Sequence, residues 1–210
     1  IGACSAKDQQ WLESICPRMP VVLINRESEY FSTVCTDNDE VGLMAATKIR
    51  QKGYTEAAIF ASGHSYFATN RRVQAFINSC ERLGIKTDEK YILKGLSTRK
   101  GGYEIGKQYA SLKEPPKMIF CDSDAIALGA LRAFHEQGIS VPKDAQLLSI
   151  GMLDPEDASY YVPSLSVVEM PDREIGQQVI RLVRKKVLNN DLTPEHVNLH
   201  AKLVLRESFS

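Results

Sequence analysis

The chain has 210 residues, of which 43% are hydrophobic and 25% charged, proportions typical of a globular protein that can bury a sizeable core. Its 26 lysines and arginines balance its 26 aspartates and glutamates, so the chain as a whole has no electrostatic attraction for nucleic acid or anionic membrane. No apolar run approaches the roughly 20 residues that a membrane-spanning helix needs.

Strand and helix patterns alternate along the chain, with short connections between them. Strands are predicted at Val21–Ile24, Val34–Thr36, Ala57–Ala61, Tyr91–Leu93, Met118–Cys121, Gln146–Ile150 and Leu165–Val168, with one or two more within residues 197–205. Helices are predicted from Asp37 to Lys52, over about Thr69–Leu83, over Lys100–Leu112, from Asp124 to Gly138 and over Asp172–Leu188. This alternation predicts an α/β protein with mainly parallel sheets covered on both faces.

The segment that begins at Met118 is the most informative part of the chain. The strand Met118–Cys121 runs into a polar turn, Asp122-Ser123-Asp124, which opens a helix that ends at Gly138. Open α/β sheets bind small ligands at the carboxyl ends of their strands. The turn therefore marks a candidate edge for ligand binding.

The five cysteines favour a reducing, cytosolic environment. They contain no CxxC pair, and one of them stays unpaired in any disulfide scheme. Cys4, Cys35 and Cys121 lie in or at the ends of apolar strands, where a small buried thiol fits. This pattern argues against a catalytic or metal-binding cysteine.

Several other patterns argue against catalysis, metals and cofactors. Gly101-Gly102 with Gly106 lacks the GxGxxG spacing of a dinucleotide site. His196 and His200 fall on a predicted strand, where they merely share one face. A basic cluster near the end of the long last helix suits the helix dipole and a solvated face: Arg181, Arg184, Lys185 and Lys186. We expect no enzyme activity, no metal and no cofactor.

An ordered series of motifs runs from Thr36 to Ser208. It comprises Thr36-Asp37-Asn38, Gly42, Gly53-Tyr54, Ile59-Phe60-Ala61, Gly63, Arg72, Ala75-Phe76, Asp124, Ala127-Leu128-Gly129, Gly138, Val141-Pro142, Ile150-Gly151, Tyr161, Pro163, Leu165-Ser166, Gly176 and Arg206-Glu207-Ser208. This series resembles the effector-binding domains of the LacI/GalR (lac-repressor) family of transcriptional regulators. Ala75 departs from the family pattern, which has glycine there.

The resemblance implies two Rossmann-like subdomains with parallel sheets, of the type I periplasmic-binding-protein kind, and a small molecule bound in the cleft between them. The expected amino-terminal subdomain comprises residues 1–36 and 169–196, and the carboxyl-terminal one residues 37–168 and 197–210. Ile1–Cys4 reads as the middle of a strand, so we expect the chain to begin inside a larger fold. Operator DNA would be bound by a helix-turn-helix head absent from this chain, and the effector domain would form a homodimer.

The resemblance also implies residues that bind the effector. Arg72, in the first turn of its predicted helix, matches an arginine that forks onto the family's effector. A surface arginine beside Arg71 is the alternative. Asp124 either contacts the ligand or caps its helix. Asn25 ends a strand where the family usually has a polar cleft residue.

The chain departs from the family pattern at three further candidate positions. Leu153 stands where the family usually has an acid that binds hydroxyls, and Ser123 replaces an asparagine. Ser97 belongs to a segment that lacks the aromatic stacking residue found there in several relatives. Leucine accepts no hydrogen bond, so the pocket becomes more basic and less suited to neutral hexoses and pentoses. Tyr66 and Phe67 form either an apolar wall for the ligand or ordinary loop packing. We expect a sugar-like effector that is anionic or partly apolar, unless the pocket serves only dimerisation.

The sequence thus predicts the effector-binding and dimerisation domain of a LacI-family transcriptional regulator, a repressor in the cytoplasm. The first alternative is a periplasmic solute-binding protein of a transport system. The odd cysteine count, the lack of a signal-peptide pattern and the Arg206-Glu207-Ser208 ending argue against it, although a start inside the fold would also remove a signal peptide. The second alternative, a cleft enzyme of the same fold class, lacks a recognisable catalytic motif.

Overall fold

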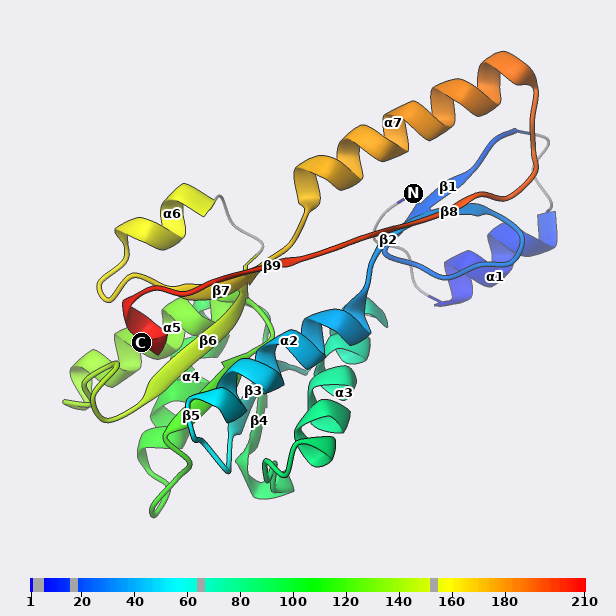
Figure 1. Cartoon of the computed structure of the whole chain (residues 1–210). Helices are drawn as coiled ribbons and strands as arrows, with labels where there is room; N and C mark the ends of the chain where they lie inside the picture. The colour runs from blue at the N-terminus through cyan, green and yellow to red at the C-terminus, as the bar shows by residue number, and fades with distance from the viewer. Residues whose placement is uncertain (2–5, 16–18, 64–66, 152–154) are drawn as a thin grey trace. The chain divides into compact units, whose positions relative to one another are not determined.

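The computed structural model describes residue 1 and residues 6–15, 19–63, 67–151 and 155–210. These residues form an α/β fold with mainly parallel sheets, which confirms the predicted fold class (Figure 1). The chain divides into two compact units: a smaller one built mainly from residues 1–37 and 171–201, and a larger one built from residues 38–65, 69–170 and 202–210. None of the helices in the described part has the length and apolar character that a membrane crossing requires.

The smaller unit is a three-stranded parallel sheet with helices. Its elements are α1 (Ala6–Ile15), β1 (Val22–Ile24), β2 (Ser32–Thr36), α7 (Asp172–Asn189) and β8 (His196–Leu199). β2 lies between β1 and β8. Ile175 and Leu182, two turns apart on α7, pack on Val22 and Val34 of the sheet. This contact fixes α7 along the strands, as Figure 1 shows.

The larger unit is a six-stranded sheet in the order β4-β3-β5-β6-β7-β9, parallel except for the β7–β9 pair. Its strands are β3 (Ala58–Ser62), β4 (Ile92–Gly95), β5 (Met118–Cys121), β6 (Gln146–Gly151), β7 (Ser166–Glu169) and β9 (Lys202–Val204). Its helices are α2 (Asn38–Gln51), α3 (Phe67–Arg82), α4 (Arg99–Ala110), α5 (Asp124–Glu136) and α6 (Pro155–Tyr160), with short 3-10 turns at Glu89–Tyr91 and Glu207–Phe209.

Within residues 197–205, where one or two strands are predicted, the structure has two, β8 and β9, which belong to different sheets. Two helices were not predicted. Helix α1 has no counterpart among the predicted elements. The same is true of α6, which has six residues, too few for a helical period to stand out in the sequence.

Two aromatic contacts tie helices to opposite faces of the larger sheet. Phe60 of β3 lies 5.5 Å from Tyr109 of α4 and 6.3 Å from Phe134 of α5, measured between ring centroids. Phe120 of β5 stacks on Phe76 of α3 at 4.0 Å, with an angle of 11° between the rings. Side chains of a strand alternate between its two faces. Helices α4 and α5 therefore cover one face, and α3 the other.

Helices α4 and α5 approach so closely that their contact has no room for a Cβ atom at several glycines. A Cβ atom on Gly102 would lie 2.1 Å from the carbonyl oxygen of Ile126, and one on Gly129 would lie 1.9 Å from that of Arg99. These glycines allow the two helices to pack. Helix packing therefore explains the glycines at the start of α4, and no nucleotide-binding role is needed to explain them.

We predict that Gly102→Ala destabilises the protein by about 1–3 kcal/mol, because the added methyl group forces the two helices apart. Gly176→Ala is the matched control. Gly176 is in α7, and a Cβ atom there meets nothing within 4 Å. The control variant should gain roughly 0.5–1 kcal/mol through helix propensity. Urea unfolding of the three proteins measures both changes, and equal stabilities of the two variants would contradict the packing argument.

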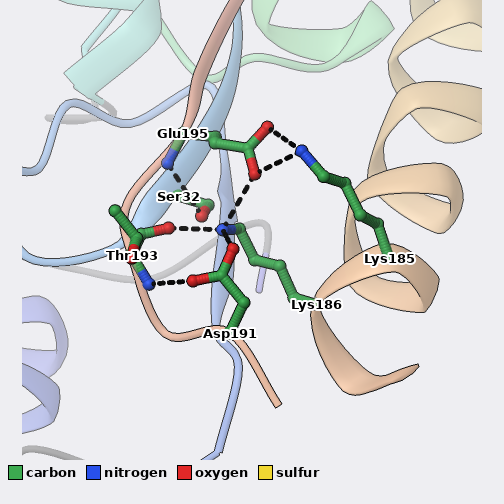
Figure 2. A network of polar contacts seen from close by, with 6 residues as sticks. All are labelled: Ser32, Lys185, Lys186, Asp191, Thr193 and Glu195. Atoms are coloured by element: carbon green, nitrogen blue, oxygen red, sulfur yellow. Dashed lines mark hydrogen bonds and ion pairs between the residues drawn. The ribbon is translucent and has the colours of Figure 1, made fainter. Parts of the chain in front are cut away.

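Lys186 lies inside the smaller unit, although its basic cluster is predicted to be solvated. Only 1% of its side chain is exposed. Figure 2 shows its ammonium group bonded to the Thr193 carbonyl oxygen, to Glu195 Oε1 at 3.1 Å and to Asp191 Oδ2 at 3.4 Å. Glu195 also donates its main-chain N–H to Ser32 Oγ at 3.1 Å. The network therefore connects the last turn of α7 to the start of β2.

This network should make the smaller unit sensitive to acid. The Thr193 hydrogen bonds and the Lys186 charge lower the pKa of Asp191. Lys185 and Lys186 lower the pKa of Glu195. A carboxylate with a lowered pKa stabilises the folded state above its unfolded pKa and loses that contribution as the pH falls through its folded pKa.

We predict that Lys186→Met reduces this acid sensitivity, because the variant lacks the ammonium partner of both carboxylates. The melting temperature should fall less in the variant than in the natural chain when the pH drops from 7 to about 3, below the ordinary pKa values of both acids. Lys143→Met, at an exposed lysine, serves as control. Identical pH profiles of the natural chain and Lys186→Met would exclude a stabilising role for the network.

Candidate functional site

Polar residues collect at the carboxyl edge of three neighbouring strands in the larger unit. β4, β3 and β5 are adjacent and parallel, so their carboxyl ends meet at one edge of the sheet. Ser62 ends β3, Ser97 follows β4 closely, and Asp122 and Ser123 follow β5. This is the edge at which open α/β sheets bind ligands.

Asp122 is the most deeply buried acid at this edge, with 1% of its surface exposed. Its Oδ2 accepts hydrogen bonds from the Ser62 main-chain N–H at 2.6 Å and from the Ser62 hydroxyl at 2.9 Å. Its Oδ1 is also buried, and no group of the described residues hydrogen-bonds to it. Burial raises the pKa of the Asp122 carboxyl, while the Ser62 hydrogen bonds and the Arg72 charge act in the opposite direction.

Arg72 is buried as well, with 3% of its surface exposed, which rules out the surface alternative. Helix α3 begins at Phe67. Arg72 therefore lies in the second turn of the helix, whereas the sequence placed it in the first turn. Its Nη2 donates to Thr69 Oγ1 at 3.4 Å. Arg71, in contrast, is exposed and pairs with Asp39 at 3.2 Å. Of the two neighbouring arginines, only Arg72 points its charge into the fold.

The register of α3 explains why Arg72 lies near Asp122. Phe76 is one helical turn after Arg72, on the same face of α3, and it stacks on Phe120. Asp122 is two residues after Phe120. Because side chains alternate along a strand, Asp122 lies on the same face of the sheet as Phe120, the face that α3 covers. Because α3 runs back against the strands, one turn towards its start corresponds to two residues towards the carboxyl end of β5.

Ser123 and Asp124 start helix α5 in different roles. The Ser123 hydroxyl is the amino-terminal cap and accepts the Ile126 main-chain N–H at 3.4 Å. It also lies 3.4 Å from the Ser97 hydroxyl. Asp124 is the first helical residue and is 5% exposed. The capping hydrogen bond predicted for Asp124 is therefore made by Ser123.

Asn25 lies in the smaller unit, directly after β1. Its backbone adopts the left-handed conformation, with a φ of 51°, which asparagine tolerates better than most residues. Its main-chain N–H donates to Val34 O at 2.9 Å, and its side-chain Oδ1 accepts the Thr36 N–H at 3.1 Å. Asn25 thus links β1 to β2, and its predicted ligand contact stays a prediction.

Three candidates cannot be placed with the others. Tyr66 and Leu153 lie outside the described residues. Phe67 is the first residue of α3, and its predicted contact with a ligand stays a prediction. Of the predicted set, the structure brings Ser97 within 3.4 Å of Ser123, which directly precedes Asp124. Arg72 lies in the same unit.

Neither the role of Ser62 nor the burial of Asp122 is predicted from the sequence. The sequence does contain a hint of both, because each is a polar residue at the end of an apolar strand. The two residues are 60 positions apart, however, and local patterns do not indicate that they are hydrogen-bonded. The expectation of a more basic pocket stays a prediction. Asp122 is an acid whose pKa the Arg72 charge lowers, against the larger effect of burial.

The described thiols are unsuited to nucleophilic chemistry. Cys35, Cys80 and Cys121 are free cysteines. Burial raises the pKa of Cys80 to about 12 and holds that of Cys121 well above its ordinary value. Both thiols therefore stay protonated near neutral pH.

Comparisons with known proteins agree with this fold. A family model described as a periplasmic binding protein-like domain matches residues 46–209. The HTH-type transcriptional repressor PurR of Escherichia coli O1:K1 is 26% identical over 195 residues, which are 91% of this chain and 57% of the relative. The chain thus spans a little over half the length of the curated relatives that it matches.

Two solved structures are similar over nearly the whole chain. A LacI family transcription regulator from Clostridium acetobutylicum is 32% identical, with a TM-score of 0.93, and the match covers 98% of this chain and 76% of that one. A LacI family transcriptional regulator from Enterococcus faecalis V583 with bound ribose is 19% identical, with a TM-score of 0.85, over 100% of this chain and 76% of that one. The second likeness concerns the fold alone.

Proposed function

This chain belongs to the LacI family, with a periplasmic binding protein-like domain, and we propose that it senses a small-molecule effector for a transcriptional repressor. The observation that carries the proposal is the polar edge formed by Arg72, Asp122, Ser97 and Ser123 in the larger unit. Buried charges are costly for stability unless something binds them. A hydroxyl-rich effector would complete the hydrogen bonds of this edge.

The proposed mechanism is a shift between conformations of the regulator. An effector changes this equilibrium only as far as its affinities for the two states differ. Two subdomains would move relative to each other. The two compact units support such a division, with β8 in the smaller one, although the sequence assigned residues 197–201 to the other. Operator DNA would be bound in the cytoplasm by a helix-turn-helix segment outside these 210 residues.

The two alternative functions receive less support. The similar curated relatives are transcriptional repressors, which does not favour a transport receptor. A cleft enzyme would need an activated nucleophile or an acid–base pair beside the ligand. The described thiols have raised pKa values, and Asp122 is engaged with Ser62. We therefore infer a binding protein and not an enzyme.

Arg72→Ala should weaken effector binding at least about tenfold, because a guanidinium forms charge-assisted hydrogen bonds with ligand oxygens. Calorimetric titration with D-ribose and other neutral pentoses and hexoses, and with their phosphates, measures the loss. Arg71→Ala is the matched control, since it removes an exposed neighbouring arginine. Unchanged affinity of Arg72→Ala, in a protein with native circular dichroism, would refute the proposed site.

We also infer a homodimer, with a surface of the larger unit as its contact. Tyr160, the last residue of α6, is 77% exposed, and Val162, just after the helix, is 94% exposed. Val162 borders a hollow of about 340 Å³, which Leu128 and Leu131 of α5 also line. Exposed apolar patches of this kind mark sites of protein association.

Val162→Arg should shift the protein from dimer to monomer, because the added charge would be buried at the contact beside Arg99 and Arg132, which line the same hollow. Light scattering coupled to size exclusion measures the molar mass of the natural chain and the variant at matched concentrations. The same change at an exposed leucine of α2, Leu43→Arg, controls for added charge. A dimer that persists in Val162→Arg would move the contact to another surface.

A further inference from the structure

Asp122 has one oxygen that its structural role does not use. Oδ2 alone holds the end of β3, through both hydrogen bonds from Ser62. Oδ1 is buried and no described group donates to it. Native proteins rarely leave a buried charged acceptor unsatisfied, and such an atom calls for a specific explanation.

The surroundings of Asp122 suit a ligand that donates hydrogen bonds. Arg72 has donors only, and the carboxylate has acceptors only. Their proximity follows from the register of α3 on β5, which the stacking of Phe76 on Phe120 sets. A hydroxyl group can accept from the guanidinium and donate to the carboxylate at the same time. A phosphate or carboxylate ligand could accept from Arg72, but it would meet the like charge of Asp122.

We propose that Asp122 is a specificity-determining residue whose Oδ1 accepts a hydrogen bond from an effector hydroxyl that Arg72 also contacts. This inference rests on the proposed function and names the chemistry of its ligand: a neutral molecule with hydroxyl groups, disfavoured when phosphorylated. It also assigns to the end of β5 the acceptor that Leu153 cannot provide. The pocket then selects neutral hydroxyl groups in place of the anions expected from the sequence.

Asp122→Asn tests the inference with almost no change in shape. The amide oxygen keeps the Ser62 hydrogen bonds, and the amide nitrogen converts the unused acceptor into a donor. The probes are neutral pentoses and hexoses, including D-ribose, and their phosphates, titrated by calorimetry. The natural chain should prefer the neutral sugars. In Asp122→Asn the affinity for the neutral sugar should fall at least about tenfold, while the affinity for the phosphate should rise.

The matched control is Asp144→Asn. Asp144 is exposed and also accepts a main-chain N–H, from Ser140 at 2.9 Å, so the same change is made outside the site. This control should bind the sugars like the natural chain. The melting temperature of ligand-free Asp122→Asn should not fall by more than about 4 °C, because the amide keeps the shape of the side chain and both Ser62 hydrogen bonds.

Three outcomes would overturn the inference. The first is unchanged sugar affinity in Asp122→Asn; if Arg72→Ala still loses binding, the proposed function stands and only the role of Asp122 fails. The second is a preference of the natural chain for the phosphates, or a parallel loss of both ligands together with a larger fall in melting temperature. The third is that the natural chain binds none of the probes, which would refute the proposed sugar-like effector along with the inference.

Discussion

The stacking of Phe76 on Phe120 is the contact on which the polar edge of the larger unit depends. It fixes how far α3 lies along β5, at a ring separation of 4.0 Å. One helical turn before Phe76 is Arg72, and two strand residues after Phe120 is Asp122. A shift of α3 by one turn would move the Arg72 guanidinium away from the Asp122 carboxylate. Each charge would then be buried without an opposite charge nearby, which strongly destabilises the folded state. Aromatic packing in the core thus sets the electrostatics of the site.

The site combines firm anchoring with unfinished hydrogen bonding. Ser62 and the Ser123 cap hold the ends of β3 and α5 in place. Sites on strand ends and helix starts are positioned more rigidly than sites on loops. At the same edge Asp122 retains an unused acceptor. An unsatisfied buried acceptor destabilises the ligand-free protein, and a ligand that donates to it removes this penalty. Ligand binding therefore stabilises the conformation of the larger unit in which the acceptor is in place.

The sequence predicts the parallel strands, the start of α5 and the family because each rests on local patterns or ordered motifs. The strand and turn around Met118–Cys121 are an example. It does not predict that Asp122 and Lys186 are buried. Asp122 meets Ser62 from another strand, and Lys186 meets carboxylates that approach only after the chain turns at Asn190. The start of α3 at Phe67 lies two residues before the predicted one, which is within the ordinary variation of assigned helix ends.

The most direct test of this account is a crystal structure of the protein with a neutral sugar bound. The account predicts a ligand hydroxyl within hydrogen-bond distance of both the Arg72 guanidinium and Asp122 Oδ1, at the carboxyl edge of β3, β4 and β5. A sugar bound in contact with neither residue would contradict it, and the buried charges of the larger unit would then need a purely structural explanation.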